Sequence, residues 1–215
     1  MNTLLPRTAR AGFTLIEAAV AAALFVLLMS SAVLAARGGM GAFRATQETS
    51  DAEARVRRAL DRTVFELLSA GASELLPDPS GDFGASDLQF RKAVGLNGTV
   101  PQWGPIQSLA FEYAPGELDD DLDNDGNGLV DDGLLVLTRD VGGDVHRVVL
   151  CSGVRELLEG EVADGDDDNG NVVRDEAGFN VHRVGDVLFV RLSVEESLEN
   201  GTIVRTLETS VRLRN

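Results

Sequence analysis

The sequence predicts an α+β protein in which one long N-terminal helix is followed by an antiparallel sheet. The helical pattern is confined to the first third of the chain, where an apolar run leads into a segment with apolar residues at helical spacing. After residue 77 the chain consists of short segments rich in β-branched residues, separated by Gly, Asn, Asp and Pro. A helix followed only by strands favours an antiparallel sheet, because parallel strands need helical crossovers between them.

The N-terminal segment has the composition of a membrane anchor. Residues 1–12 carry Arg7 and Arg10 and no acid, and residues 18–36 carry no charge. A helix over residues 14–36 would be roughly 35 Å long, which is enough to cross a hydrocarbon core of about 30 Å. The basic flank predicts that residues 1–12 stay in the cytoplasm and that the chain after Arg37 is exported.

Three interpretations of this segment compete. A cleaved secretory signal would have a shorter apolar core, although "SAVLAAR" offers small residues for a cleavage site. A plain signal anchor fits the length but gives no reason for Glu17. A carboxylate in a membrane segment is expensive and marks a function or a partner.

The third interpretation is a resemblance. The stretch "GFTLIEAAVAAALFVLL" resembles the processing site of type IV prepilins and of the pseudopilins of type II secretion. The resemblance implies that a prepilin peptidase cuts between Gly12 and Phe13 and that Phe13 is then N-methylated. It also implies that Glu17, the fifth residue of the mature chain, pairs with the N-terminal ammonium of a neighbouring subunit. The alternative for Glu17 is a carboxylate that reaches the membrane interface.

Residues 37–76 are expected to form a second, amphipathic part of the helix. Glycines at 38, 39 and 41 predict a softened or partly melted joint, and Ser50 with Glu53 fits a capping box where the helix would restart. The apolar positions on one face are Val56, Leu60, Val64, Leu67 and Leu68. "PDPSGDFG" is expected to stop the helix at residue 77.

The exported domain, residues 77–215, is expected to be β-rich. The predicted strands are residues 87–94, 106–113, 133–140, 144–151, 186–195 and 201–214, with hairpins at Gly142-Gly143 and at Asn200-Gly201. This arrangement agrees with the pilin-like fold that the resemblance implies, a long helix packed on an antiparallel sheet. The arginine-rich stretch before residue 70 and the domain size are similar to J-type minor pseudopilins and W-type minor pilins.

The net charge of −16, from 35 acidic and 19 basic residues, comes mostly from two segments. Residues 117–132 hold eight acids and no base, and residues 159–176 hold eight acids and one base. Such a balance argues against general binding to nucleic acid or to anionic lipid. Because the rest of the chain is nearly neutral, the two segments need a local explanation.

Calcium offers that explanation. "DLDNDGNGLVDD" (121–132) and "DGDDDNGNVVRD" (164–175) align without a gap, with Asp at positions one, three, five and twelve of both. Alternate carboxylates around a turn-permitting Gly126 or Gly170 resemble EF-hand-like and dockerin-type calcium loops, and the alternative is a pair of solvated acidic linkers. The predicted calcium ligands are Asp121, Asp123, Asp125 and Asp132 in the first segment and Asp164, Asp166, Asp168 and Asp175 in the second.

The sequence predicts that the protein is not an enzyme. His146 and His182 lie on separate strand-like stretches, and the single cysteine, Cys151, is expected to be a small buried side chain. The expected function is a minor pilin or pseudopilin of the bacterial inner membrane that initiates or caps a periplasmic filament for type II secretion or type IV pilus assembly. Its partners would be other pilin subunits and the prepilin peptidase. The alternative is a membrane-tethered, calcium-stabilised module that recognises a surface or a secreted substrate.

Overall fold

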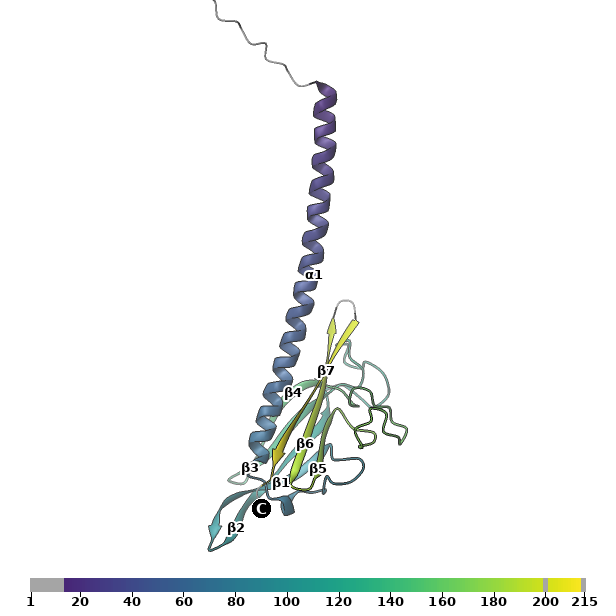
Figure 1. The fold of residues 1–215 in the computed structure, drawn as a ribbon. Helices are drawn as coiled ribbons and strands as arrows, with labels where there is room; N and C mark the ends of the chain where they lie inside the picture. Colours follow the sequence, from purple (N-terminus) through teal and green to yellow (C-terminus); the bar gives the residue numbers. More distant parts are fainter. Residues whose placement is uncertain (1–13, 199–200, 214–215) are drawn as a thin grey trace, which may run out of the picture. The chain divides into compact units, whose positions relative to one another are not determined.

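A computed structural model describes residues 14–198 and 201–213 of the chain. It confirms the α+β architecture, with one α-helix, α1 (Leu15–Leu67), packed against antiparallel strands through its C-terminal part (Figure 1). The chain forms two units, residues 1–47 and residues 48–215, and α1 begins in the first and ends in the second. The predicted leader, with the cleavage residues Gly12 and Phe13, lies outside the described residues.

The first unit contains the membrane-length part of α1. Its apolar side chains, among them Leu24, Phe25 and Leu28, are exposed within this unit. The hydroxyls of Ser30 and Ser31 donate to the backbone carbonyls of Val26 and Leu28, so both polar groups are satisfied within the helix itself. Among the described residues, α1 is the one helix with the length and composition to cross a membrane.

The expected joint at the glycines is wrong, because α1 is helical throughout residues 37–53. Each glycine weakens a helix by about 1 kcal/mol relative to alanine, but helical segments on both sides propagate the hydrogen-bonded ladder through them. The predicted restart at Ser50 is absent for the same reason. Glu53 instead pairs with Arg57 at 2.8 Å, one turn further along the helix.

In the second unit, one face of α1 is buried on the sheet. Of the predicted apolar face, Val56, Leu60 and Leu67 are buried, whereas Leu68, which follows the last residue of α1, is 46% exposed. The buried carboxylate of Glu66 forms ion pairs with Arg62 of α1 and with Lys92 of strand β1 (Asp87–Asn97). The helix ends at Leu67, short of the predicted end at residue 76, and the chain continues through the 3₁₀ helix η1 (Ala72–Glu74) to the sheet.

The sheet has seven antiparallel strands, six of them in the order β1-β2-β3-β4-β6-β5. The seventh strand, β7, lies off this path and pairs with β6. The remaining strands are β2 (Val100–Tyr113), β3 (Gly133–Val141), β4 (Asp144–Val154), β5 (Phe179–Val184), β6 (Val187–Leu198) and β7 (Gly201–Arg212). The sequence predicted all of them except β5, in which polar Asn180, His182 and Arg183 interrupt the apolar pattern. Of the predicted Asn200-Gly201 turn, Asn200 lies outside the described residues.

The strand register brings two long connections together at one end of the sheet. The connection from β2 to β3 ends at Gly133, and the connection from β4 to β5 begins after Val154. Gly133 and Val154 are register partners, so the two connections start from adjacent points. These connections contain the two acidic segments.

The core of the second unit lies between α1 and the sheet. Leu188, Val190, Leu192 and Val194 alternate along β6 and are fully buried, which is the period expected for one face of a strand. Other members of this core are Ala59, Leu88, Phe90, Leu109, Leu135, Leu137, Cys151, Phe179, Val181 and Val211.

Replacing Leu67 by Ala should destabilise the second unit by about 2–5 kcal/mol, because it removes a fully buried side chain and leaves a cavity. Leu68→Ala is the matched control, since the side chain of Leu68, the next residue, is 46% exposed. We expect thermal unfolding of the full-length protein in detergent, followed by circular dichroism, to show a clearly lower midpoint for Leu67→Ala alone. Equal midpoints for the two variants would contradict this packing.

Candidate functional site

Glu17 lies at the first turn of α1 and forms a reciprocal cap with Thr14. The backbone N–H and the hydroxyl of Thr14 donate to Oε2 of Glu17 at 2.9 and 2.8 Å, and the backbone N–H of Glu17 donates to the Thr14 hydroxyl at 3.3 Å. This is a capping box, and a carboxylate there also offsets the positive end of the helix dipole. The pattern Thr-x-x-Glu is readable in the sequence, but sequence reasoning assigned Glu17 only an intermolecular role.

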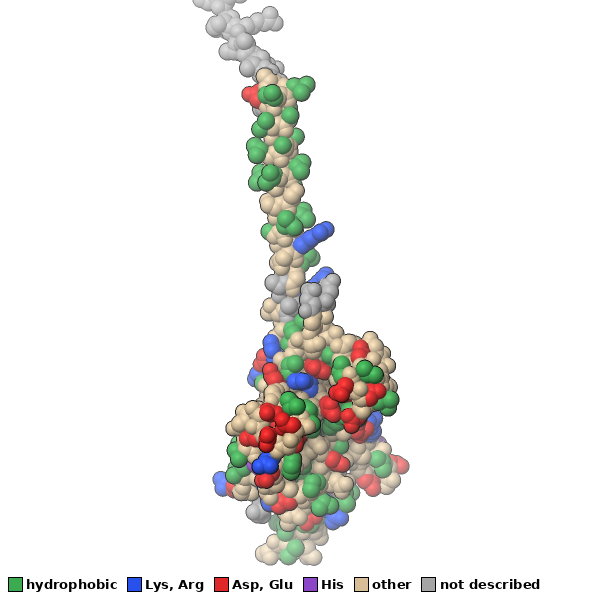
Figure 2. Space-filling view, turned by 90° about the vertical axis from the view of Figure 1, so that its right-hand side faces the viewer, with side chains coloured by type: hydrophobic (Ala, Val, Ile, Leu, Met, Phe, Trp, Pro, Cys, Tyr) green, Lys and Arg blue, Asp and Glu red, His purple; other side chains and the backbone are tan. Residues whose placement is uncertain are grey.

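The two acidic connections adopt the same closed form. We call residues 117–132 the first acidic loop and residues 161–176 the second acidic loop. Backbone bonds close the base of each: Ala114 N–H donates to the carbonyl of Asp132 at 2.9 Å, and Leu158 N–H donates to that of Glu176 at 2.8 Å. Figure 2 shows the acidic side chains gathered on one face of the second unit.

One aspartate organises the backbone of each loop. Both carboxylate oxygens of Asp123 accept hydrogen bonds from three consecutive backbone N–H groups, those of residues 126, 127 and 128. Asp167 accepts the same three bonds from residues 170, 171 and 172. Although partial burial opposes ionisation, these three donors hold the pKa of Asp167 below its ordinary value.

The hydrogen bonds and the backbone conformation repeat at a spacing of 44 residues. Asp131 accepts from the N–H groups of Asp120 and Asp121, and Asp175 accepts from those of Asp164 and Gly165. Residues with a positive φ occur in matching pairs: 116 and 160, 121 and 165, 126 and 170, 128 and 172, and 131 and 175. The two loops are therefore structural duplicates.

This spacing differs by one residue from the alignment of the sequence, which pairs Asp121 with Asp164 and Asp123 with Asp166. In the structure, Asp123 corresponds to Asp167, and the counterpart of Asp166 is Leu122. The sequence alignment matched the runs of aspartate in the two loops. In the structure, the equivalent residues are those that accept hydrogen bonds from backbone N–H groups. Asp166 is exposed, and Asp168 accepts the N–H of Val162 at 3.1 Å.

The first acidic loop brings three carboxylates together. Oxygen atoms of Glu117, Asp125 and Asp132 all lie within 4.8 Å of one another, and this group could hold a metal ion. Burial raises the pKa of Asp132, and the nearby Asp125, Glu117 and Asp123 add to that rise, opposed by a hydrogen bond from Asn127. Of the predicted ligands, the structure places Asp125 and Asp132 in the group and adds Glu117, which sequence reasoning missed.

Glu117 and Glu161 are equivalent residues, and both are almost fully buried, at 6% and 7% exposed. Oε1 of Glu117 accepts the backbone N–H of Asp125 at 2.7 Å, and Oε1 of Glu161 accepts that of Asn169 at 3.1 Å. In each case Oε2 is buried without a hydrogen-bond partner among the described residues. A sequence alignment at a spacing of 44 residues would have identified both glutamates as equivalent.

The second acidic loop has different chemistry at the matching positions. Asn169 replaces Asp125, and Glu176 replaces Asp132. The Arg191 guanidinium of β6 binds Oε1 of the fully buried Glu176 at 2.6 Å, while the amide of Asn169 donates to Oε2 at 3.1 Å. Here the chain provides its own cation.

A smaller cavity of about 260 Å³ lies between the loops, lined by Asp121, Asp131, Glu156, Glu161 and Glu195 together with Arg155. Burial raises the pKa of Glu156, and Asp119, Asp131 and Asp121 add to the rise. Glu156 accepts a hydrogen bond from the Tyr113 hydroxyl at 3.3 Å. The strongly acidic character of this end of the sheet therefore extends beyond the loops themselves.

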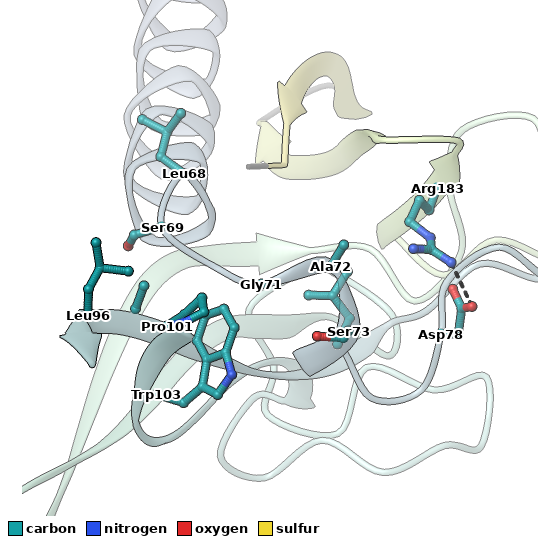
Figure 3. A pocket seen from close by; sticks show the side chains of 12 residues that line it. Leu68, Ser69, Gly71, Ala72, Ser73, Asp78, Leu96, Pro101, Trp103 and Arg183 are labelled. Carbon is teal, nitrogen blue, oxygen red and sulfur yellow. Dashed lines mark hydrogen bonds and ion pairs between the residues drawn. The ribbon is translucent and has the colours of Figure 1, made fainter. Parts of the chain in front are cut away.

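A larger cleft of about 1010 Å³ lies at the C-terminal end of α1 (Figure 3). Its lining is mainly apolar and includes Leu68, Leu96 and Trp103, with one ion pair between Asp78 and Arg183 at 2.7 Å. Gly71 is required here, since a Cβ at this residue would lie 2.4 Å from the Trp103 ring. The cleft is therefore suited mainly to apolar contact.

The cysteine and both histidines lie on strands of the sheet. Cys151 of β4 is buried, as predicted, and desolvation raises the pKa of its thiol to about 11, so the reactive thiolate is scarce at neutral pH. His146 lies on β4 and His182 on β5, on different strands.

Comparison with known families gives one match. Residues 7–33 match the family model of the prokaryotic N-terminal methylation motif, which is consistent with the type IV prepilin and pseudopilin family. No curated protein and no solved structure matches the chain. The match covers the segment that carries Gly12, Phe13 and Glu17 and supports a structural subunit of pilin type.

Replacing Asp167 by Ala should open the turn of the second acidic loop, because three backbone N–H groups lose their common acceptor. Hydrogen exchange measured by mass spectrometry should become faster at residues 170–172. Asp166→Ala is the control and should leave exchange unchanged. The reverse result would favour the spacing of 43 residues found in the sequence.

Proposed function

We propose that this chain is a minor pilin or pseudopilin, a structural subunit that initiates or caps a periplasmic filament for type II secretion or type IV pilus assembly. The observation that carries the proposal is the methylation motif at residues 7–33, with Glu17 fifth after the expected cleavage site. The motif implies processing by a prepilin peptidase and contact with other pilin subunits.

The fold is consistent with this role. A single helix supplies both an apolar segment of membrane length and, further along, a face buried on the sheet of the second unit. The proposed location is the bacterial inner membrane, with the second unit in the periplasm. The same helix would supply the core of a filament, where apolar segments exchange lipid contacts for contacts with neighbouring subunits.

The minor role rests on two weaker observations. The domain is large for a major pilin, and the helix carries the arginine-rich stretch that resembles J-type and W-type minor subunits. In this structure Arg55 of that stretch pairs with Glu196 of β6 at 2.6 Å, and Arg62 pairs with Glu66. The first pair joins the helix to the sheet, and the second lies within the helix.

A second candidate function is favoured by the acidic loops. In this proposal the chain is a membrane-tethered, calcium-stabilised module that recognises a surface or a secreted substrate. Calcium would serve either function, because an ion between the crowded carboxylates removes their mutual repulsion and holds the loops in one form. The predicted ligand sets place such ions in both loops.

The mass of the mature N-terminus tests the first function against its alternatives. We expect membranes of the native host to yield a chain that begins at Phe13 and carries one added methyl group. A chain that begins near Ala36 would indicate ordinary secretion, and an uncut chain that begins at Met1 would indicate a plain anchor. Either result would overturn the filament proposal.

Replacing Glu17 by Gln should abolish incorporation into filaments while leaving membrane insertion and cleavage intact, because the charge that pairs with a neighbouring N-terminus is lost. Thr14→Val is the matched control: it breaks the local cap but keeps the carboxylate. Incorporation is measured by immunoblotting of sheared filaments. Equal loss in both variants would assign Glu17 to helix capping instead of subunit pairing.

A further inference from the structure

We infer that the two acidic loops, although structural duplicates, are neutralised differently: the first binds one divalent cation at Glu117, Asp125 and Asp132, and the second uses Arg191. This inference deepens the calcium part of the proposed function and does not depend on the filament role. It names a ligand that the sequence pattern omits, and it reduces the expected occupancy from two ions to one.

One carboxylate oxygen of Glu117 is buried and unsatisfied. This side chain is 6% exposed, and its Oε2 has no hydrogen-bond partner among the described residues. A buried carboxylate oxygen without a donor is unfavourable unless a cation meets it. The oxygen belongs to a carboxylate that already lies within 4.8 Å of oxygens of Asp125 and Asp132.

The three carboxylates also carry negative charge that no described ion pair offsets. Glu117, Asp125 and Asp132 contribute three formal negative charges, and no ion pair among the described residues includes any of them. The nearby Arg155 is paired with Glu195 of β6 at 3.4 Å and with none of these three carboxylates. Oxygen ligands with a high negative charge are what calcium prefers.

The second acidic loop has Glu161, Asn169 and Glu176 at the matching positions, which is one carboxylate fewer. Oε2 of Glu161 is buried without a hydrogen-bond partner among the described residues, as in Glu117, so the two loops differ in the groups around this glutamate and not in the glutamate itself. Arg191 binds Glu176 at 2.6 Å and also binds Glu208 at 2.7 Å, so it is fixed from two sides. With Glu208 included, the group of Glu161, Glu176, Glu208 and Arg191 has a net charge of −2, compared with −3 for the three carboxylates of the first loop. A divalent cation would also have to approach a guanidinium that already occupies the Glu176 carboxylate.

Strand β6 enforces this difference. Arg191 and Glu195 are four residues apart on the same strand, so their side chains point to the same face. Arg191 binds Glu176 of the second acidic loop, whereas Glu195, near Asp132 of the first, is itself paired with Arg155 at 3.4 Å. Among the described ion pairs, strand β6 thus supplies a cation to the second copy of the loop and none to the first.

Calcium stoichiometry tests the inference. The full-length protein in detergent micelles is dialysed to equilibrium against radioactive calcium chloride at physiological ionic strength. We expect one bound ion per chain. Glu117→Gln keeps the acceptor for the N–H of Asp125 but removes the charge, and it should weaken binding by about tenfold or more.

Matched variants assign the ion to a loop. Asp125→Asn introduces the residue that the second loop carries at the same position, so it should fold and should also weaken binding. Glu161→Gln is the equivalent of Glu117→Gln in the second loop and should leave binding unchanged. Arg191→Gln removes the internal cation and should raise the stoichiometry to two ions.

The possible results separate the inference from the broader calcium proposal. Two ions in the unaltered chain, one lost in Glu117→Gln and the other in Glu161→Gln, would overturn the inference and leave calcium in both loops. A single ion lost only in Glu161→Gln would also overturn it, as would a stoichiometry of one in Arg191→Gln. No bound calcium in the unaltered chain would overturn both.

Discussion

The burial of one face of α1 on the sheet is the contact on which the rest of the second unit depends. Val56, Leu60 and Leu67 belong to the same core cluster as the buried residues of the sheet, and the ion pair between Glu66 and Lys92 joins the helix to β1. On the sheet that this core supports, the hairpin register of β3 and β4 sets the bases of both acidic loops side by side.

The same helix has to satisfy two different environments. Its first part exposes leucine, valine and phenylalanine and satisfies its serines internally, as a lipid environment requires. Its last turns carry arginine and glutamate beside the apolar face, as a surface helix requires. The backbone hydrogen bonds of a helix do not depend on whether its side chains are apolar or charged, so one continuous helix can serve both environments. The glycines between the two parts weaken the helix without breaking it.

Sequence patterns predicted most of this fold because they report burial. The alternation of apolar residues identified six of the seven strands, and the helical spacing of Val56, Leu60 and Leu67 identified the buried face. Strand β5 was missed because its polar residues are held by tertiary contacts: buried Asn180 donates to the carbonyl of Phe83 at 2.9 Å, and Arg183 pairs with Asp78. Such contacts join residues about a hundred positions apart and leave no local signal.

The candidate metal site was only partly predictable for a related reason. Aspartates at alternate positions marked the correct segments, but composition does not distinguish a carboxylate that shapes the backbone from one that faces an ion. Asp123 and Asp167 belong to the first kind, since each accepts three backbone N–H groups.

Glu117 and Glu161 lie outside the runs of aspartate and face inward because the loop closes over them. Arg191 could not be assigned from the loops at all, because it arrives from β6. Duplicated loops need the same backbone-shaping residues but not the same charges, and in this chain a neighbouring strand supplies a cation to the second copy.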